Sequence, residues 1–345
     1  MPCYKFRQSI SGRFPTRFLQ GCSCPKRGAS RSADKRHEAG TIRYRSVNRY
    51  RFRARQEHRI SKAPPRNQEK SMSTVRQKAN SRISHLRSLL CVGLDSDDQK
   101  IPEIFKKTGS PVLEFNRAII RATSNSAVAY KINTAFYEAR GIPGIQDMER
   151  TLADIPRACI TIADAKRADI GNTSKKYAEA FFEHWSFDAL TVAPYMGFDS
   201  LEPFFAYEDK LVFVLCLTSN EGSKDFEEQL LGDGRPLYET VLEKVNQWNR
   251  GGNAGIVVGA TKNGQLEAIR AAAPDLFFLI PGVGAQGGSL DEAVRYGADS
   301  AKESALVNVS RSLIFPQGAF ASIDAFEQAV SVESEKLHLA MKRAM

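Results

Sequence analysis

The chain has 345 residues, of which 42% are apolar and 26% charged, a composition typical of a globular protein with one large core or two modest ones. No run of about 18 apolar residues occurs, which argues against a transmembrane helix. The six cysteines are too few and too scattered for a disulfide framework. We therefore expect a reducing, cytoplasmic setting with no membrane partner.

The net charge of +10 is distributed very unevenly along the chain. Residues 1–71 contain 19 Lys and Arg against 4 Asp and Glu, whereas residues 72–345 contain 30 against 35. The basicity thus belongs to the leader and not to the body. A nucleic-acid partner inferred from the overall charge would be wrong for the body of the protein.

The leader, residues 1–71, is rich in Arg and Ser and has neither helical nor strand periodicity. Such a segment buries too little apolar surface to offset its ordering entropy, so we expect it to be disordered. Three interpretations remain open: a start codon assigned too far upstream, with Met72 as the true start; a tail that contacts nucleic acid or anionic surfaces; or a transit-like peptide. We take residues 72–345 as one domain.

Eight short apolar runs follow Met72, each nearly continuous in apolarity, as strands buried on both faces should be. The runs are Leu89–Asp95, Ala127–Asn133, Cys159–Ala165, Ala189–Pro194, Leu211–Thr218, Gly255–Ala260, Leu276–Val283 and Ala305–Ser310. Helical periodicity occurs between them, in Val112–Thr123, Lys175–His184, Leu237–Trp248, Gln265–Ala272 and Leu290–Tyr296. Eight alternating units of this length predict an α/β protein, a parallel (β/α)8 TIM barrel. Cys91, Cys159 and Cys216 lie inside such runs and are expected to be buried thiols.

Polar residues gather where these strands end, which in a (β/α)8 barrel is the side of the active site. They are Asp95, Lys131, Asp164, Lys166, Thr218, Ser219, Gly282–Gly288, Ser310 and Arg311. Any one charge could be a solvated strand end, but alternating charges on the first three strands require mutual pairing if they are buried. Such pairing would keep each lysine protonated and each carboxylate ionised.

The densest segment is residues 161–173, which contain Asp164-Ala-Lys-Arg-Ala-Asp169. Because residues two apart on a strand point to the same side, Asp164 and Lys166 should both face the barrel mouth. Arg167 would point away, and Asp169 would lie in the loop that leads to the next helix. Lys131, from the second strand, should reach the same pocket.

These residues resemble the Asp-x-Lys-x-x-Asp signature of the orotidine 5′-phosphate decarboxylase family. Further segments are similar to its longer bacterial (type 2) subgroup, and they fall in order across residues 85–315: Leu94-Asp95, Tyr130-Lys131-Ile-Asn133, Val192-x-Pro-Tyr-Met-Gly197, Leu217-Thr-Ser-Asn220 and Pro281-Gly-Val-Gly-Ala-Gln286-Gly-Gly288. The chain departs from the subgroup at Ile132, where a proline is expected. The leader has no counterpart.

The resemblance implies decarboxylation of orotidine 5′-phosphate to UMP, the last step of de novo pyrimidine nucleotide synthesis, with no cofactor and no metal. Lys166 would then lie against C6 of the pyrimidine, stabilise the carbanion and deliver a proton. Asp164 would hold Lys166, Lys131 would bridge the carboxylates, and Asp95 would bind the ribose hydroxyls. Asp169 and Thr173 would complete the pocket of a neighbouring subunit, so a homodimer with shared active sites is implied.

The remaining substrate contacts follow from the loops. Loops after the seventh and eighth strands commonly bind phosphate, and here Gly287, Gln286, Ser310 and Arg311 are the candidate residues. Ser219 would bind the pyrimidine amide edge, with Thr218 beside it. The polar segment Asn220–Arg235 is a candidate for a mobile lid.

Two other functions compete with this one. A related lyase of the same barrel would act on a keto-sugar phosphate and need a divalent metal, usually with an acidic ligand near the position of Lys131. Alternatively, the arginine-rich leader would be the functional part and bind nucleic acid. The negative balance of residues 72–345 argues against the second.

Overall fold

The computed structural model describes residues 73–284 and 287–345. The interpretations of residues 1–71 therefore lie outside the described part of the chain. None of the helices in the described part is both long and apolar enough to cross a membrane.

Eight parallel strands close into one barrel in the order of the sequence, β1 to β8, with β1 pairing β8. Their bounds are β1 Leu90–Gly93, β2 Ala129–Asn133, β3 Ile160–Arg167, β4 Ala189–Val192, β5 Leu211–Leu217, β6 Ala254–Val258, β7 Phe277–Pro281 and β8 Ala305–Val309. Each predicted apolar run contains one of them or most of one, so the predicted (β/α)8 barrel is confirmed. β3 continues two residues further than predicted, to Arg167.

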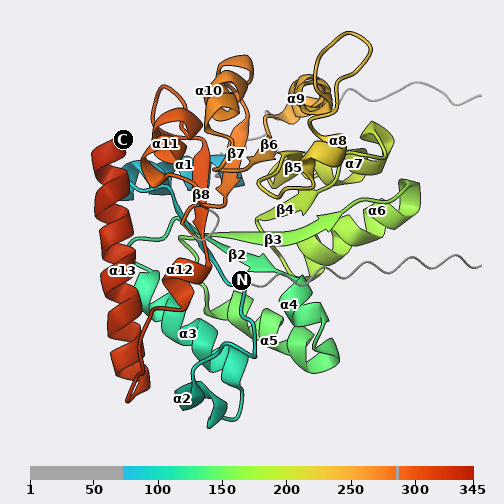
Figure 1. The fold of residues 1–345 in the computed structure, drawn as a ribbon. Coiled ribbons are helices and arrows are strands. Elements are labelled where there is room, and N and C mark those ends of the chain that lie inside the picture. Colours follow the sequence, from blue (N-terminus) through green and yellow to red (C-terminus); the bar gives the residue numbers. More distant parts are fainter. Residues whose placement is uncertain (1–72, 285–286) are drawn as a thin grey trace, which may run out of the picture. The chain divides into compact units, whose positions relative to one another are not determined.

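Helices connect the strands and surround the barrel (Figure 1). The α-helices are α1 Val75–Leu86, α2 Glu103–Lys106, α3 Pro111–Thr123, α4 Ala135–Glu138, α5 Gly141–Asp154, α6 Gly171–Ala178, α7 Phe198–Phe205, α8 Ser223–Phe226, α9 Leu237–Trp248, α10 Asn263–Ala272, α11 Leu290–Gly297, α12 Arg311–Ile314 and α13 Ile323–Ala344. A π-helical turn, η1 Glu179–His184, extends α6, and a 3-10 turn, η2 Asn249–Gly251, follows α9. The last helix, α13, packs against α3 and α11.

Helix α1 lies at the amino ends of the strands and is tied to the residues that precede several of them. Arg82 donates to the carbonyl of Ala127, just before β2, and Lys78 pairs with Asp188, just before β4, at 2.9 Å. A capping box at Thr74 starts the helix. The amino end of the barrel is thereby held by hydrogen bonds and an ion pair, on the side opposite the strands' carboxyl ends.

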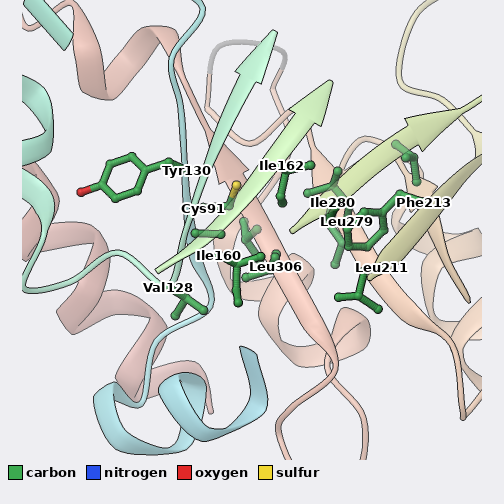
Figure 2. Close-up of a cluster of buried hydrophobic side chains, with 14 of the residues drawn as sticks. Cys91, Val128, Tyr130, Ile160, Ile162, Leu211, Phe213, Leu279, Ile280 and Leu306 are labelled. Atoms are coloured by element: carbon green, nitrogen blue, oxygen red, sulfur yellow. The ribbon is translucent and has the colours of Figure 1, made fainter. Parts of the chain in front are cut away.

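The barrel interior is filled by side chains at alternate positions along each strand. Figure 2 shows Ile160 and Ile162 of β3, Phe213 of β5 and Leu279 of β7 among the buried apolar residues. A β-carbon on Gly255 would lie 2.7 Å from the Phe213 ring, so the glycine makes room for that ring in the core. Since the interior is packed, the substrate cavity can only open at an end of the barrel.

The three thiols of the body, Cys91, Cys159 and Cys216, are buried and unpaired, as expected. Cys91 lies on the inner face of β1, beneath the charged residues described below. Burial raises the pKa of the Cys91 thiol to about 12, so this group is a neutral part of the core at physiological pH.

Candidate active site

A cavity of roughly 250 Å³ opens at the carboxyl ends of the strands. The side chains that line it are the next inward-facing residues along the strands. On β3, Asp164 follows the core residues Ile160 and Ile162, and on β5, Leu215 follows Phe213. This alternation places polar and charged side chains of β1 to β4 on one part of the wall. The apolar side chains of Leu215, Val257 and Leu279 lie on another.

Lys131 is at the centre of the charged part. Its ammonium group lies 3.0 Å from Asp164 Oδ2 and 3.2 Å from Asp95 Oδ1, and the residue is only 3% exposed. Lys166 Nζ lies 2.6 Å from Asp164 Oδ1, and its side chain is half-exposed toward the cavity. Three adjacent strands therefore carry an alternating row of carboxylates and ammonium groups.

The electrostatics of the row keep both kinds of group charged. Burial alone would raise the pKa of Asp164, but Lys131 and Lys166 hold that pKa well below the usual range of a carboxyl. Burial alone would likewise lower the pKa of Lys131, but Asp164 and Asp95 outweigh it and raise that pKa above the usual value. Asp164 and Lys131 thus carry fixed opposite charges over the ordinary pH range.

Lys166 reaches the cavity by a route that simple strand alternation did not predict. The register between β3 and β4 shifts between Ala163 and Arg167, and Lys166 has a φ of +47°. A left-handed backbone is uncommon for a residue other than glycine, and a bulge of this kind redirects a side chain. Arg167 points elsewhere and forms an ion pair with Glu138.

The loop after β5 is anchored close to the cavity. Thr218 lines the cavity, but its hydroxyl and its backbone N–H both donate to the carboxylate of Glu227, at 2.9 and 2.7 Å. Lys262, from the loop after β6, forms an ion pair with Glu228. The candidate lid, residues 220–235, contains the short helix α8. Through the Glu228–Lys262 ion pair it contacts the loop after β6.

The glycine-rich loop after β7 forms a tight turn beside the cavity. Gly282, Gly284 and Gly287 have φ values of +102°, +75° and +85°, which favour glycine. The N–H of Gly288 donates to the carbonyl of Gly282, and helix α11 begins two residues later with Ser289 as its N-cap. Gly282 and Val283 line the cavity together with Ser310 and Arg311 of the following strand end.

The structure brings most of the predicted site residues together around one cavity, namely Asp95, Lys131, Asp164, Lys166, Thr218, Ser219, Ser310 and Arg311. Three described residues of the predicted set, Asp169, Thr173 and Gly287, are not part of its wall. Asp169 accepts a hydrogen bond from the Ile170 N–H, and Thr173 is exposed. Gln286 lies outside the described residues.

Several lining residues were not among the predicted site residues. The polar ones are Asn133, Thr191, Asn220 and Asn308. Thr191 and Asn308 lie within apolar strands, at 1% and 6% exposure. Counting inward positions by twos along each predicted strand would have found both, since Thr191 shares a face with Ala189, and Asn308 shares a face with Leu306 and Ser310.

No group of three or more His, Cys, Asp or Glu side chains within residues 73–284 and 287–345 is arranged to hold a metal ion. The acidic side chains at the cavity, Asp95 and Asp164, are instead paired with lysine.

Comparison with known proteins gives consistent matches over the barrel. The model of the orotidine 5′-phosphate decarboxylase / HUMPS family matches residues 88–318. A protein named orotidine 5′-phosphate decarboxylase from Dehalococcoides mccartyi (strain CBDB1) is 48% identical over 255 residues, covering 71% of this chain and 93% of the relative. A protein of the same name from Flavobacterium johnsoniae is 48% identical over 263 residues, covering 75% and 96%.

Solved structures agree with these sequence relatives. The structure of Leishmania donovani OMP decarboxylase superposes with a TM-score of 0.65 at 39% identity, covering 77% of this chain and 99% of that one. Leishmania donovani UMP synthase superposes with a TM-score of 0.67 at 41% identity, covering 77% of this chain and 57% of that one. With the family matched over most of its length, this chain belongs to the orotidine 5′-phosphate decarboxylase / HUMPS family.

Proposed function

We propose that this protein decarboxylates orotidine 5′-phosphate to UMP without a metal or organic cofactor. The observation that carries the proposal is the row formed by Asp95, Lys131, Asp164 and Lys166, with one half-exposed ammonium group at the cavity. Relatives named for this activity cover 71% and 77% of the chain, and the family match over residues 88–318 includes all four residues of the row.

The chemistry needs stabilisation of charge in the plane of the pyrimidine ring. The bond from C6 to the carboxylate breaks, CO2 leaves, and the electron pair stays on C6, where the ring π system does not delocalise it. Fixed charges that need no reorganisation are the means by which a protein stabilises such a species. The Lys166 ammonium would then transfer a proton to C6, and the lysine would recover a proton from water.

The other side chains of the cavity wall are assigned by the same proposal. Asp164 lies near the departing carboxylate and holds Lys166 in place. Lys131 and Asp95 contact the ribose hydroxyls. Ser219, with Thr218 beside it, recognises the pyrimidine edge, and the apolar wall that includes Leu215 excludes water from the reacting carbon.

The 5′-phosphate is assigned to the loops after β7 and β8. Arg311 offers a bidentate cation, and Ser310 offers a hydroxyl beside it. The family resemblance adds Gly287 and Gln286 to these proposed phosphate-binding residues. Binding energy from the phosphate, far from C6, would serve to hold the ring in the reactive position.

We also propose that the active unit is a cytoplasmic homodimer. Asp169 and Thr173 are not part of the cavity wall of their own chain, which supports a contribution to a partner's site. Large apolar side chains are exposed on the loops after β3, β4 and β5: Ile170 at 60%, Tyr195 at 86%, Phe226 at 64% and Leu230 at 70%. Tyr195 and Phe226 lie side by side, with ring centroids 6.5 Å apart, and exposed apolar side chains of this size favour burial against a second copy. The unpaired thiols support the reducing compartment.

The direct test is the loss of orotidylate absorbance with purified, metal-free protein. Wild type should turn over, and Lys166→Ala should retain less than about 1% of the activity, equivalent to about 2.7 kcal/mol in the barrier. Lys336→Ala, an exposed residue of α13, is the matched control and should keep full activity. Substantial activity in Lys166→Ala would refute the role given to this lysine.

The alternatives are separated by two further measurements. Turnover of orotidylate that persists in EDTA excludes the metal-dependent keto-sugar-phosphate lyase. Deletion of residues 1–71 should leave turnover unchanged, because every proposed site residue belongs to the barrel. Loss of turnover on deletion would instead give the leader a functional part.

The shared site has its own test. Subunits carrying Asp169→Ala and subunits carrying Lys166→Ala should each be nearly inactive alone. In each mixed dimer one of the two sites has both residues intact and should be active, so a minority of all sites in the mixture should regain activity. No recovery on mixing would count against a contribution across the subunit boundary.

A further inference from the structure

The register shift between β3 and β4 lies directly beside the reactive lysine. Ala163 pairs with Leu190, and the next pair along the ladder is Arg167 with Val192. Three residues of β3 therefore stand opposite a single residue of β4, Thr191. A bulge of this kind leaves backbone groups of the longer strand without a ladder partner, so something else has to satisfy them.

The side chain of Thr191 supplies a partner for one of these backbone groups. Its hydroxyl oxygen accepts from the backbone N–H of Lys166 at 3.0 Å. Lys166 is the residue with a φ of +47°, a conformation that costs free energy in a lysine and persists only where neighbours hold it. Thr191 is 1% exposed, so this hydrogen bond is shielded from competing water.

The same hydroxyl also orients the carboxylate that binds the lysine side chain. Thr191 Oγ1 donates to Asp164 Oδ1 at 3.1 Å, and its direction is unambiguous because an ionised carboxylate can only accept. Lys166 Nζ lies 2.6 Å from that same oxygen. One hydroxyl group is thus hydrogen-bonded both to the main chain of Lys166 and to the oxygen that holds its ammonium group.

We propose that Thr191 is a positioning residue that sets where the Lys166 ammonium group lies in the cavity. It closes a ring that runs from the Lys166 backbone through Thr191 and Asp164 to Lys166 Nζ. Without the hydroxyl, the main chain at Lys166 loses the partner that favours its left-handed conformation, and Asp164 loses one of the contacts that orient it. This inference rests on the proposed role of Lys166 in turnover.

The decisive variant is Thr191→Val, which keeps the shape of the side chain and removes the hydroxyl. Displacement of a reactive group by about 1 Å can cost about 100-fold in rate, and we expect kcat to fall by roughly that factor. KM should stay within about threefold of wild type, because Thr191 is not assigned to substrate recognition. Thr191→Ser restores the hydroxyl and should recover kcat to within about threefold of wild type.

Amide hydrogen exchange gives a readout that does not depend on turnover. In Thr191→Val the Lys166 N–H loses its acceptor, and its exchange should accelerate by about tenfold or more while the other strands of the barrel keep their protection. Thr191→Ser should restore slow exchange at Lys166.

Thr161→Val is a closely matched control from the opposite end of the barrel. The Thr161 hydroxyl also bridges a backbone N–H and a carboxylate, since it accepts from Asp188 N at 3.0 Å and donates to Asp188 Oδ2 at 3.3 Å. Its loss removes equivalent hydrogen bonds far from the cavity. This variant should lose stability but keep kcat.

The outcomes separate this inference from the proposed function. Absence of orotidylate turnover in wild type would refute the proposed function, and hydrogen exchange at Lys166 would still test the Thr191 contact. If wild type turns over but Thr191→Val keeps more than about one third of kcat, raises only KM, or is not rescued by serine, the positioning role is wrong. If Thr191→Val does not fold, Thr191→Ala is judged by the same criteria.

Discussion

Gly93 of β1 faces Ser310 at the end of β8 so closely that a β-carbon on Gly93 would lie 1.8 Å from Ser310 Oγ. The contact is possible only because Gly93 has no side chain. It lets the hydroxyl of Ser310 occupy the cavity wall next to Arg311, in the part assigned to the phosphate.

Gly93→Ala should therefore displace Ser310 and weaken nucleotide binding. We expect KM to rise by about tenfold with a smaller change in kcat, since the phosphate that Ser310 would bind is remote from C6. Steady-state kinetics on orotidylate measure both. Gly264→Ala is the control, because a β-carbon at Gly264 meets nothing within 4 Å, and kinetics should not change. An unchanged KM in Gly93→Ala would show that Ser310 is not needed for binding.

Lys131 separates two carboxylates that would otherwise face each other in the cavity wall. Lys131→Met should reduce the free energy of unfolding by about 3–5 kcal/mol, because it leaves buried charge uncompensated. Adding Asp164→Asn to Lys131→Met removes one of those charges and should restore part of the loss. Urea unfolding of the two single variants and the double variant measures the coupling. Additive losses in this cycle would contradict the pairing.

Acid should destabilise the protein partly through Asp164. The pKa of this carboxyl is lower in the folded protein than in the unfolded chain, so its contribution is present above the usual carboxyl pKa of about 4 and is lost as the pH falls toward the folded value. Lys131 has a raised pKa, so its contribution is complete below the usual lysine value of about 10.4 and is lost only as the pH rises through the folded value.

Between about pH 4 and pH 10 both contributions of this ion pair should thus be constant. Below about pH 4, the free energy of unfolding of wild type should fall more steeply than that of Asp164→Asn, which lacks the titrating group. Urea unfolding at a series of pH values measures the difference between the two slopes. Parallel curves in the acid range would show that Asp164 does not have a lowered pKa.

The barrel itself was predictable from the sequence because buried parallel strands are apolar on both faces. Ile162 and Ala163 show the point, since these neighbours on β3 point to opposite faces and both are fully buried. The charges at the strand ends were predictable for a related reason. Lys131 and Asp164 directly follow apolar residues, and such groups are buried only where they pair.

The bulge at Lys166 was not predictable in the same way. The alternation rule placed Lys166 on the correct side of the barrel but assumed a regular strand, whereas the side chain reaches the cavity through a left-handed residue. Alternation along the predicted strand gives Thr191 an inward position, but threonine is an ordinary strand residue, so the sequence did not indicate its contacts with Lys166 and Asp164. The engagement of Thr218 by Glu227 depends on the path of the intervening loop, which no local pattern of residues specifies.

Arg270 tests whether interactions that stabilise the amino end of the barrel also affect turnover at the cavity. It is 9% exposed, and its guanidinium donates to the carbonyls of Gly297, Leu276 and Ser304 while lying 3.4 Å from the centre of the Phe278 ring. Burial lowers the pKa of Arg270 to about 10, but the group stays charged near neutral pH.

Arg270→Met should lower the free energy of unfolding by about 3 kcal/mol or more, because it leaves several buried carbonyls without a donor. Arg270→Lys should restore only part of this, since an ammonium group cannot reach carbonyls on both sides as the planar guanidinium does. Turnover per folded molecule should be unchanged in both variants, because Arg270 contacts the residues that precede β7 and β8 and not the strand ends at the cavity. Thermal unfolding and kcat are measured on the same samples. If kcat of a variant is lowered at temperatures below its melting range, the two ends of the barrel are coupled.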